Sequence, residues 1–318
     1  MNMTRFRKTQ GFTLIELMIT LVLSLMITYS IAQVLISSNH SSVSSDGISQ
    51  SQETGRFVMS YLANNIRQSG LDSVPSDDGD DDISIPAFID CTTFSTLAAN
   101  QCIGESNTDN ADDPNVADTE LTIHSAGSHG DRLAVAWVPP VPVNAAGVEV
   151  PALFATNVRD CTGRAVYVKG DIILNVFWVQ SDPNNPDPLP SPPDLDNPTM
   201  NNLVCQAYKF NGGIATEPSD VIPIANGIES MQILYGESLN PLPIDTQDRN
   251  VNQYVTGAAV TNWNRVYAVR IAILTRSLIA ITSQTAVRNY VLLDAQPYVM
   301  NDAVSRQVFT TTFVINNI

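Results

Sequence analysis

Apolar residues fill the first part of the chain, and a single ionisable side chain interrupts them. Residues 12–36 are almost continuously hydrophobic, and Glu16 is the one charged residue among them. As a helix, this stretch extends about 37 Å at ~1.5 Å per residue, enough to cross ~30 Å of hydrocarbon. The basic residues Arg5, Arg7 and Lys8 lie just before it, which keeps that end in the cytoplasm and the rest outside. We therefore predict a transmembrane helix over residues 12–36.

A second helical stretch follows, with a different pattern. Residues 37–46 are polar and rich in serine, which lowers their helix propensity. Apolar residues then recur at helical spacing from Ile48 to Leu71 and define one face. We predict an amphipathic extension over residues 37–71, with Gly70 as its stop and Gly55 as a place where it could bend.

Beyond residue 71 the pattern is that of β-strands separated by Gly, Pro, Asn and Asp. Residues 72–318 are therefore expected to form a β-rich, mainly antiparallel globular domain, which with the helix makes an α+β fold. Residues 181–199 hold seven prolines, so we expect a long irregular loop there. The expected strands are residues 120–124, 131–138, 165–168, 172–180, 203–210, 228–235, 265–275, 286–293 and 307–315.

The charge of the chain excludes one class of partner. The formal net charge is −16, and without its first eleven residues, which hold three bases and no acid, it would be −19. Proteins bind nucleic acid largely through phosphate neutralisation by Lys and Arg. Direct nucleic-acid binding is therefore not expected.

Four cysteines lie beyond the apolar run, at Cys91, Cys102, Cys161 and Cys205. An even number in an exported domain predicts two disulfides, and three connectivities are possible. Nearest-neighbour pairing, Cys91 with Cys102 and Cys161 with Cys205, is the simplest. No C-x-x-C pair is present, which argues against a thiol redox motif.

Catalytic residues are sparse. His124 and His129 lie near Ser125, Ser128 and Asp131, which allows a Ser-His-Asp hypothesis. However, the chain has no G-x-S-x-G elbow and no phosphate-binding G-x-x-x-x-G-K-[ST] loop. We therefore predict that the protein is not an enzyme and has no catalytic residues.

One acidic loop is a candidate for metal binding. Asp77, Asp78, Asp80 and Asp82 surround Gly79, and carboxylate oxygens are the ligands that Ca²⁺ prefers. The loop lacks the full spacing of a D-x-[DN]-x-[DN]-G-x5-E site. A solvated acidic loop is the favoured interpretation, so no cofactor is expected, with Ca²⁺ as the alternative.

The stretch around the start of the apolar run, K-T-Q-G-F-T-L-I-E-L over residues 8–17, resembles the class III leader of type IV pilins and type II secretion pseudopilins. The resemblance implies that a prepilin peptidase cuts between Gly11 and Phe12 and methylates the new N-terminus at Phe12. Residues 1–11 would then be the leader, and Glu16 would be the fifth residue of the mature chain. We expect the Glu16 carboxylate to matter for assembly more than for membrane insertion, through an ion pair with the new α-amine or with a neighbour's.

Further segments resemble the PilW family of type IV pilus minor pilins. They are D-R-L-A-V over residues 131–135, G-I-E-S-M-Q-I-L-Y-G over 227–236, V-Y-A-V-R-I over 266–271, Arg276-Ser277 and the final strand over 306–312. Tyr254, Ala258 and Trp263 follow the central segment at similar distances.

The resemblance implies assembly rather than chemistry. The expected role is a minor pilin that primes and assembles a type IV pilus, at the tip, for twitching motility, adhesion or DNA uptake. The implied partners are other minor pilins, the major pilin, prepilin peptidase and the inner-membrane assembly machinery. The protein would span the inner membrane once and then enter the pilus at the cell surface. A type II secretion J-type pseudopilin and a tip adhesin that binds a ligand are the alternatives.

Overall fold

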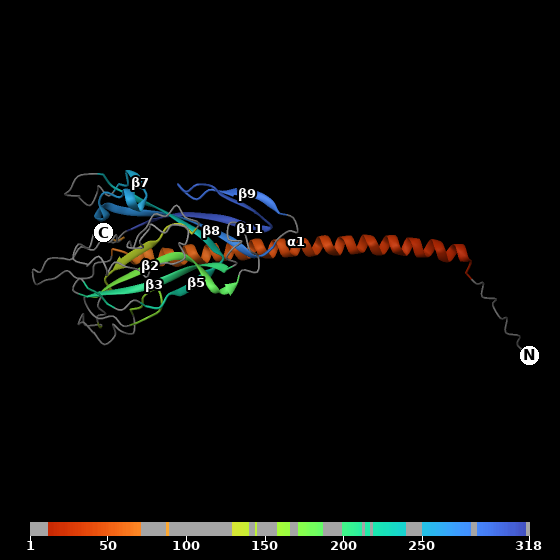
Figure 1. Cartoon of the computed structure of the whole chain (residues 1–318), viewed down its shortest axis with the longest axis horizontal. Coiled ribbons are helices and arrows are strands. Elements are labelled where there is room, and N and C mark those ends of the chain that lie inside the picture. The colour runs from red at the N-terminus through yellow and green to blue at the C-terminus, as the bar shows by residue number, and fades with distance from the viewer. Residues whose placement is uncertain are drawn as a thin grey trace, which may run out of the picture.

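Figure 1 shows the computed structural model of the chain, a long helix that carries a β-rich domain at one end. Its helix α1 spans Leu14–Gln68 without a break, so the possible bend at Gly55 is absent. The residues that the structure describes are 12–70, 87–88, 129–139, 144, 158–165, 171–186, 199–211, 214–216, 219–239, 250–280 and 285–315.

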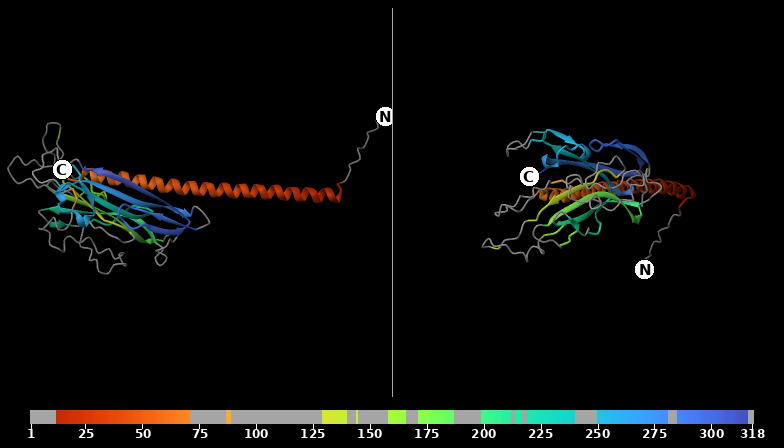
Figure 2. Two further views of the ribbon diagram at one scale, coloured as in Figure 1. Left: turned by 90° about the horizontal axis from the view of Figure 1, so that it is seen from above. Right: turned by 60° about the vertical axis from the view of Figure 1, so that its left-hand side comes forward.

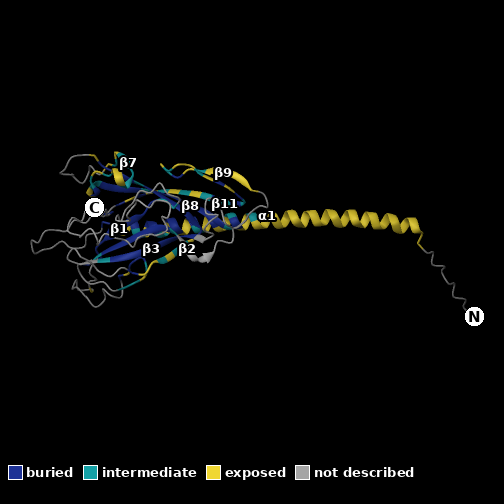
Figure 3. Ribbon diagram, in the orientation of Figure 1, coloured by how far each residue is buried: buried dark blue, intermediate teal, exposed yellow. Residues whose placement is uncertain are grey.

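The two halves of α1 have different surroundings (Figure 3). Every residue from Phe12 to Ser42 is exposed, whereas one face of the second half is buried. The helix ends as the sequence predicts: Ser69 caps it through its backbone N–H, which donates to the Ile66 carbonyl, and Gly70 follows with φ of 68°. Only glycine adopts this left-handed conformation without strain. The buried residues of α1 are Gly47, Ser51, Gly55, Val58, Met59, Leu62, Ala63 and Ile66.

A first sheet covers one side of this buried face. Its strand order is β1-β2-β3-β4, β5 also pairs with β3, and all the pairs are antiparallel. Successive residues of β1 face opposite sides of the sheet. Leu133 and Val135 lie toward α1, and Ala134 and Ala136 belong to a separate outer cluster. The strands are β1 (Leu133–Trp137), β2 (Ile172–Pro186), β3 (Thr199–Asn211), β4 (Ile214–Thr216) and β5 (Ile222–Asn226).

A second sheet covers the other side, in the order β11-β8-β6-β7, again antiparallel. A hairpin of β9 and β10 packs on its outer face, where Leu292 contacts Ala272 and Leu274. The strands are β6 (Ile228–Glu237), β7 (Gln253–Val255), β8 (Val266–Ala280), β9 (Ala286–Tyr290), β10 (Tyr298–Asp302) and β11 (Val304–Val314). Two 3-10 turns, η2 (Gly257–Ala259) and η3 (Trp263–Arg265), precede β8.

The buried face of the second half of α1 packs against both sheets, and the helix lies along one side of them (Figures 1 and 2). One core cluster contains Leu62 of α1, Phe177 of the first sheet and Ile271 of the second, all fully buried. The chain passes from the first sheet to the second at Gly227, whose φ is 75° and whose N–H donates to the Asn201 carbonyl. The helix therefore contributes one face to a core that it shares with both sheets, while its other face is exposed.

The closest approach between α1 and the second sheet is at Gly55. A Cβ atom at this position would lie 2.2 Å from Cε2 of Phe309 and 2.5 Å from its Cδ2. The absence of a side chain therefore lets the Phe309 ring of β11 lie directly on the helix backbone. The glycine costs about 1 kcal/mol of helix propensity relative to alanine, and the packing of the ring explains its place here.

A disulfide joins Cys161 to Cys205 of β3, with 6.4 Å between the two Cα atoms. This is the pairing that the sequence analysis preferred for these two residues, while Cys91 and Cys102 lie outside the described residues. The Tyr61 hydroxyl of α1 donates to the Cys161 carbonyl at 2.7 Å. Burial raises the pKa of Tyr61, and the Asp160 carboxylate raises it further, so the hydroxyl remains a proton donor.

Seven of the expected strands appear as β1, β2, β3, β6, β8, β9 and β11. Residues 120–124 and 166–168 lie outside the described residues. The prediction of an irregular loop from residue 181 is wrong at its start, because β2 continues to Pro186, which pairs with Thr199 after a shift in register. Four short strands were not predicted: β4, β5, β7 and β10.

The position of α1 in the core predicts how truncations behave. A fragment that begins at Asp46 keeps the whole buried face, whereas one that begins at Asp72 loses it. Each buried Val, Leu or Ile side chain stabilises the fold by roughly 1.5–3 kcal/mol, and the total stability of a domain is about 5–15 kcal/mol. The first fragment should be monomeric and unfold cooperatively in a thermal scan, and the second should aggregate. Equal solubility and cooperativity would contradict this role of α1.

Close packing at Gly55 predicts the effect of a single methyl group. In the fragment that begins at Asp46, Gly55→Ala should lower the free energy of unfolding by about 1 kcal/mol or more, since overpacking costs roughly 1–3 kcal/mol. With Phe309→Leu present, the same change should become neutral or stabilising. Urea unfolding of the four variants measures this coupling. Ser60→Ala, on an exposed turn of the same helix, reports the propensity effect alone, and a stabilising Gly55→Ala in the Phe309 background would contradict the packing argument.

Candidate functional site: the exposed helix and the motif sheet

The start of α1 is a capped helix end that holds the predicted assembly carboxylate. The Thr13 side chain accepts a hydrogen bond from the Glu16 N–H at 3.3 Å, and the Leu17 N–H donates to the Thr13 carbonyl at 3.2 Å. Glu16 therefore lies in the first turn, where the helix dipole favours a negative charge. Phe12, immediately before this turn, is 83% exposed. Gly11 lies outside the described residues.

The hydroxyl residues of the apolar run are satisfied within the helix. Ser24 and Thr28 donate to the carbonyls of Thr20 and Ser24, at 2.7 and 2.8 Å. Thr20 and Ser30 donate in the same way, at 3.0 Å each, to the carbonyls of Leu17 and Met26. Because a polar group in hydrocarbon must find an internal partner, these side chains are compatible with a membrane span.

Glu16 differs from these hydroxyl residues. Among the described residues, no side chain donates a hydrogen bond to its carboxylate within the distances expected for one. A carboxylate at membrane depth costs roughly 2.5–3.5 kcal/mol even on insertion scales. The rest of the run is apolar and exposed, and by length and composition α1 could cross a membrane. The helix thus presents an apolar surface with one charge, for which the described residues hold no hydrogen-bond partner.

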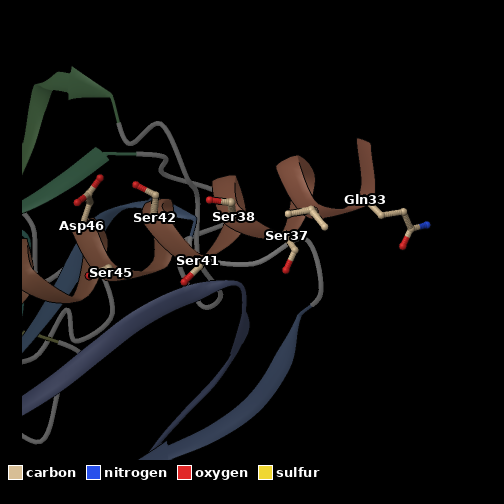
Figure 4. A pocket seen from close by; sticks show the side chains of 8 residues that line it. Gln33, Ser37, Ser38, Ser41, Ser42, Ser45 and Asp46 are labelled. Carbon is tan, nitrogen blue, oxygen red and sulfur yellow. The ribbon is translucent and has the colours of Figure 1, made fainter. Parts of the chain in front are cut away.

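Serines line one side of α1 between the apolar run and the domain (Figure 4). The sequence predicts weak helix here, yet α1 is continuous through the segment. The small side chains leave a shallow, fully exposed surface. Its lining residues are Gln33, Val34, Ser37, Ser38, Ser41, Ser42, Ser45 and Asp46.

Most of the sequence motifs lie in the second sheet, whereas the segment over residues 131–135 leads into β1 of the first sheet. The central segment over residues 227–236 forms most of β6, the segment over 266–271 opens β8, and the final motif lies on β11. Tyr254 of β7 pairs with Gly236, and the ring of Trp263 packs edge-on against Tyr235 with 4.9 Å between centroids. Segments that are up to about 85 residues apart in sequence therefore build one layer.

A buried ion network ties these motifs together. Arg306 of β11 donates from Nη2 to the Glu229 carboxylate of β6 at 2.8 Å, and from Nη1 to Asp302 at 2.8 Å. Arg276 of β8 lies 3.8 Å from Glu229. Burial by itself would lower the pKa of Arg306, but its hydrogen bonds with Glu229 and Asp302 hold that pKa above its ordinary value. The directional bonds of this network fix β11 and the hairpin relative to β6.

Two further carboxylates anchor the middle and the end of β6. The Asp131 carboxylate accepts from the Ile233 N–H at 2.7 Å, which joins the start of the first sheet to the second. Glu237, fully buried, accepts from the N–H groups of Thr261 and Asn262 at 3.0 and 2.8 Å. Both acids satisfy backbone donors, as expected of structural side chains.

The structure describes two residues of the Ser-His-Asp hypothesis, Asp131 and His129, and both are bonded to the backbone of β6. Asp131 is 2% exposed and bonded to the β6 backbone, and His129 accepts through its carbonyl from the Met231 N–H at 3.2 Å. His124, Ser125 and Ser128 lie outside the described residues. The acidic-loop residues Asp77, Asp78, Asp80 and Asp82 also lie outside them, and within the described ranges no group of three His, Cys, Asp or Glu side chains could hold a metal.

The network of Glu229, Asp302 and Arg306 was not predicted from the sequence. The sequence did carry a signal for this network, because Glu229 and Arg306 are charged residues within apolar β-strand patterns. A charged residue that is buried by such a pattern requires a partner of opposite charge. Which acid pairs with which base depends on the order β11-β8-β6, and the sequence does not give that order.

Comparison with known families finds two matches. A model described as prokaryotic N-terminal methylation motif matches residues 6–28, which include Gly11, Phe12 and Glu16. A model described as type IV pilus-assembly protein W matches residues 176–317, which include the whole second sheet. Comparisons with curated proteins and with solved structures gave no match. Since the apolar helix, the leader and the motif sheet agree with these matches, the chain belongs to the PilW family of type IV pilus minor pilins.

Proposed function

We propose that this pilin primes and assembles a type IV pilus together with other minor pilins, at the filament tip. The observation that carries the proposal is the first half of α1, an exposed apolar helix whose first turn holds a carboxylate with no ion-pair partner among the described residues. The surface is suited to lipid before assembly and to other pilin helices afterwards. The folded domain at its other end is suited to contacts with neighbouring subunits.

The chemistry at the N-terminus supports an assembly role. In this proposal prepilin peptidase cuts between Gly11 and Phe12 and methylates the new amine. The cut creates a positive charge about one helical turn from Glu16. An ion pair between the Glu16 carboxylate and such an amine, from the same chain or a neighbour, offsets the cost of the buried charge. A charge pair of this kind also fixes the axial position of one helix against another.

In this proposal the protein moves from the inner membrane to the pilus. The precursor spans the inner membrane once, with the β-rich domain outside, and the inner-membrane machinery then transfers it to the pilus together with the major pilin. Oxidised Cys161–Cys205 is consistent with folding outside the cytosol. No cofactor enters the proposal, and Ca²⁺ at residues 77–82 remains the alternative given by the sequence.

The test is complementation of a strain that lacks this chain. Wild-type protein should restore surface pili, and gold-labelled antibody against the domain should mark filament ends. Capture of the membrane-embedded protein should recover the other minor pilins of the same system. Restored protein secretion without restored pili would instead support a type II secretion pseudopilin, and a normal pilus number without the protein would favour an adhesin.

Substitution of Gly11 is predicted to block cleavage of the precursor. A peptidase site that accepts a residue without Cβ should reject a β-branched one, so Gly11→Val should leave an uncleaved precursor in the membrane, about eleven residues longer. Mass spectrometry of the N-terminus measures cleavage and methylation together. Thr9→Val, two residues earlier, is the matched control and should be processed. Normal maturation of Gly11→Val would overturn the leader assignment.

Substitution of Glu16 is predicted to impair assembly but not insertion into the membrane. Glu16→Ala removes a costly group from the membrane, so the variant should insert at wild-type levels. Its incorporation into sheared pili or into the minor-pilin complex should fall at least tenfold, because the charge pair is lost. Thr20→Ala, one turn later, removes only a satisfied hydroxyl and should assemble normally. Equal incorporation of Glu16→Ala and wild type would contradict the charge-pair argument.

A further inference from the structure

The last strand of the second sheet has an open edge. Among the described strands, β11 pairs with β8 on one side and with none on the other. It is 11 residues long, and its exposed positions include Val308, Thr310, Thr312 and Val314. A long exposed edge offers a row of backbone donors and acceptors to another strand.

The direction of the free backbone groups follows from the pairing. The Ile315 N–H donates to the Tyr267 carbonyl of the neighbouring strand at 2.9 Å. Backbone groups alternate in direction along an antiparallel strand, so those of Val308, Thr310, Thr312 and Val314 point away from β8. The same four residues carry their side chains on the outer face. The open edge thus offers four successive N–H and C=O pairs beside exposed side chains.

The edge has none of the usual protection against strand pairing. Residues 307–318 contain no charged residue and no proline, in a chain with twice as many acids as bases. Exposed edges in soluble proteins are normally guarded by lysine, proline or a bulge. Between residues 306 and 314 the pairing of β11 with β8 is regular. The edge is therefore neutral, straight and rich in β-branched residues.

Arg270 adds a charge next to this edge. Its guanidinium lies 4.1 Å from the centroid of the Tyr254 ring, and Nε donates to the Thr312 hydroxyl at 3.1 Å. Within the described part of the chain, no carboxylate forms an ion pair with Arg270, whereas Arg164, Arg276 and Arg306 each lie beside one. Tyr254 and Thr312 hold the guanidinium on the outer face, so an anion that approaches the edge meets a fixed cation.

We propose that β11 is the docking edge for a strand of another pilin subunit of the same pilus, and that Arg270 binds an acidic side chain of that strand. Main-chain bonds along an added strand give affinity, and side-chain contacts give specificity. A residue opposite Thr312 on that strand has its Cβ about 4.5–5.5 Å from that of Thr312, within reach of the guanidinium held there. The inference rests on the proposed function, because it names the surface through which this pilin selects a neighbour.

A second copy of this chain is a poor occupant of the edge. The strands of the second sheet run along the length of α1 (Figure 2). A twofold antiparallel pair of β11 edges would therefore send the two anchors in opposite directions, and one membrane could not hold both. Two domains of net charge near −19 would also repel each other. A different pilin with an acidic residue on an edge strand satisfies both constraints.

A proline substitution tests the backbone hydrogen bonds of the edge separately from its side chains. Thr310→Pro removes an N–H that points away from β8, a position where edge strands tolerate proline. Thr310→Val keeps the N–H and is the matched control. In membranes that contain the full chain and the other pilins of its pilus, co-capture of one of those pilins should fall at least tenfold with Thr310→Pro and stay within twofold with Thr310→Val. Arg270→Gln should reduce it about tenfold, and Arg270→Lys less.

A photo-crosslinking amino acid in place of Thr310 identifies the occupant. It should yield an adduct with a strand of another pilin, assigned by peptide mapping, whereas the same group in place of Val299, exposed on β10, should not. An adduct with a second copy, or equal co-capture of the Thr310→Pro and Thr310→Val variants, would overturn the inference. Glu16→Ala in the same assay keeps the two proposals apart. If Glu16→Ala abolishes assembly while Thr310→Pro does not, only the edge inference fails.

Discussion

Close packing of the second sheet on α1 fixes the rest of the architecture. Phe309 lies on the backbone at Gly55, and Val58, Leu62 and Ile66 belong to the core that the helix shares with both sheets. The second half of α1 is held in the domain by this packing, and the helix continues without a break through the serine-rich segment into the apolar run. The apolar run and the domain therefore belong to one continuous helix.

Apolar packing alone does not fix how the strands of the second sheet are placed against one another, and buried polar interactions do. The Glu229–Arg306–Asp302 network holds β11 and the hairpin in one register, and breaking such a network leaves a buried charge at a cost of about 3–5 kcal/mol. Asp131 and Glu237 fix the middle and the end of β6 in the same manner. The sheet that carries the family motifs is thus specified by bonds of defined direction. This suits a surface that must present one edge to a partner.

Charge is distributed unevenly over the protein. The chain is strongly acidic, yet its anchor has one carboxylate and its last strand has no charge beyond Arg306. The acidic domain stays soluble and avoids copies of itself, while the neutral helix and the neutral edge remain available for contact. The proposed assembly with chosen neighbours can use this separation of surfaces.

The sequence by itself determined the anchor, the leader and most of the strands, because hydrophobic period and charge are local signals. A run of 25 apolar residues with Glu16 allows one interpretation, and alternating residues predict β6 or β11 without knowledge of their neighbours. Only the tertiary structure decided that one face of α1 packs on both sheets, that Gly55 receives Phe309, and that Glu229 pairs with Arg306 across 77 residues. Short strands such as β5 and β7 also escaped prediction, because three to five residues gain their stability from a partner strand and not from their own pattern. The open edge of β11 follows from strand order, which no local pattern encodes.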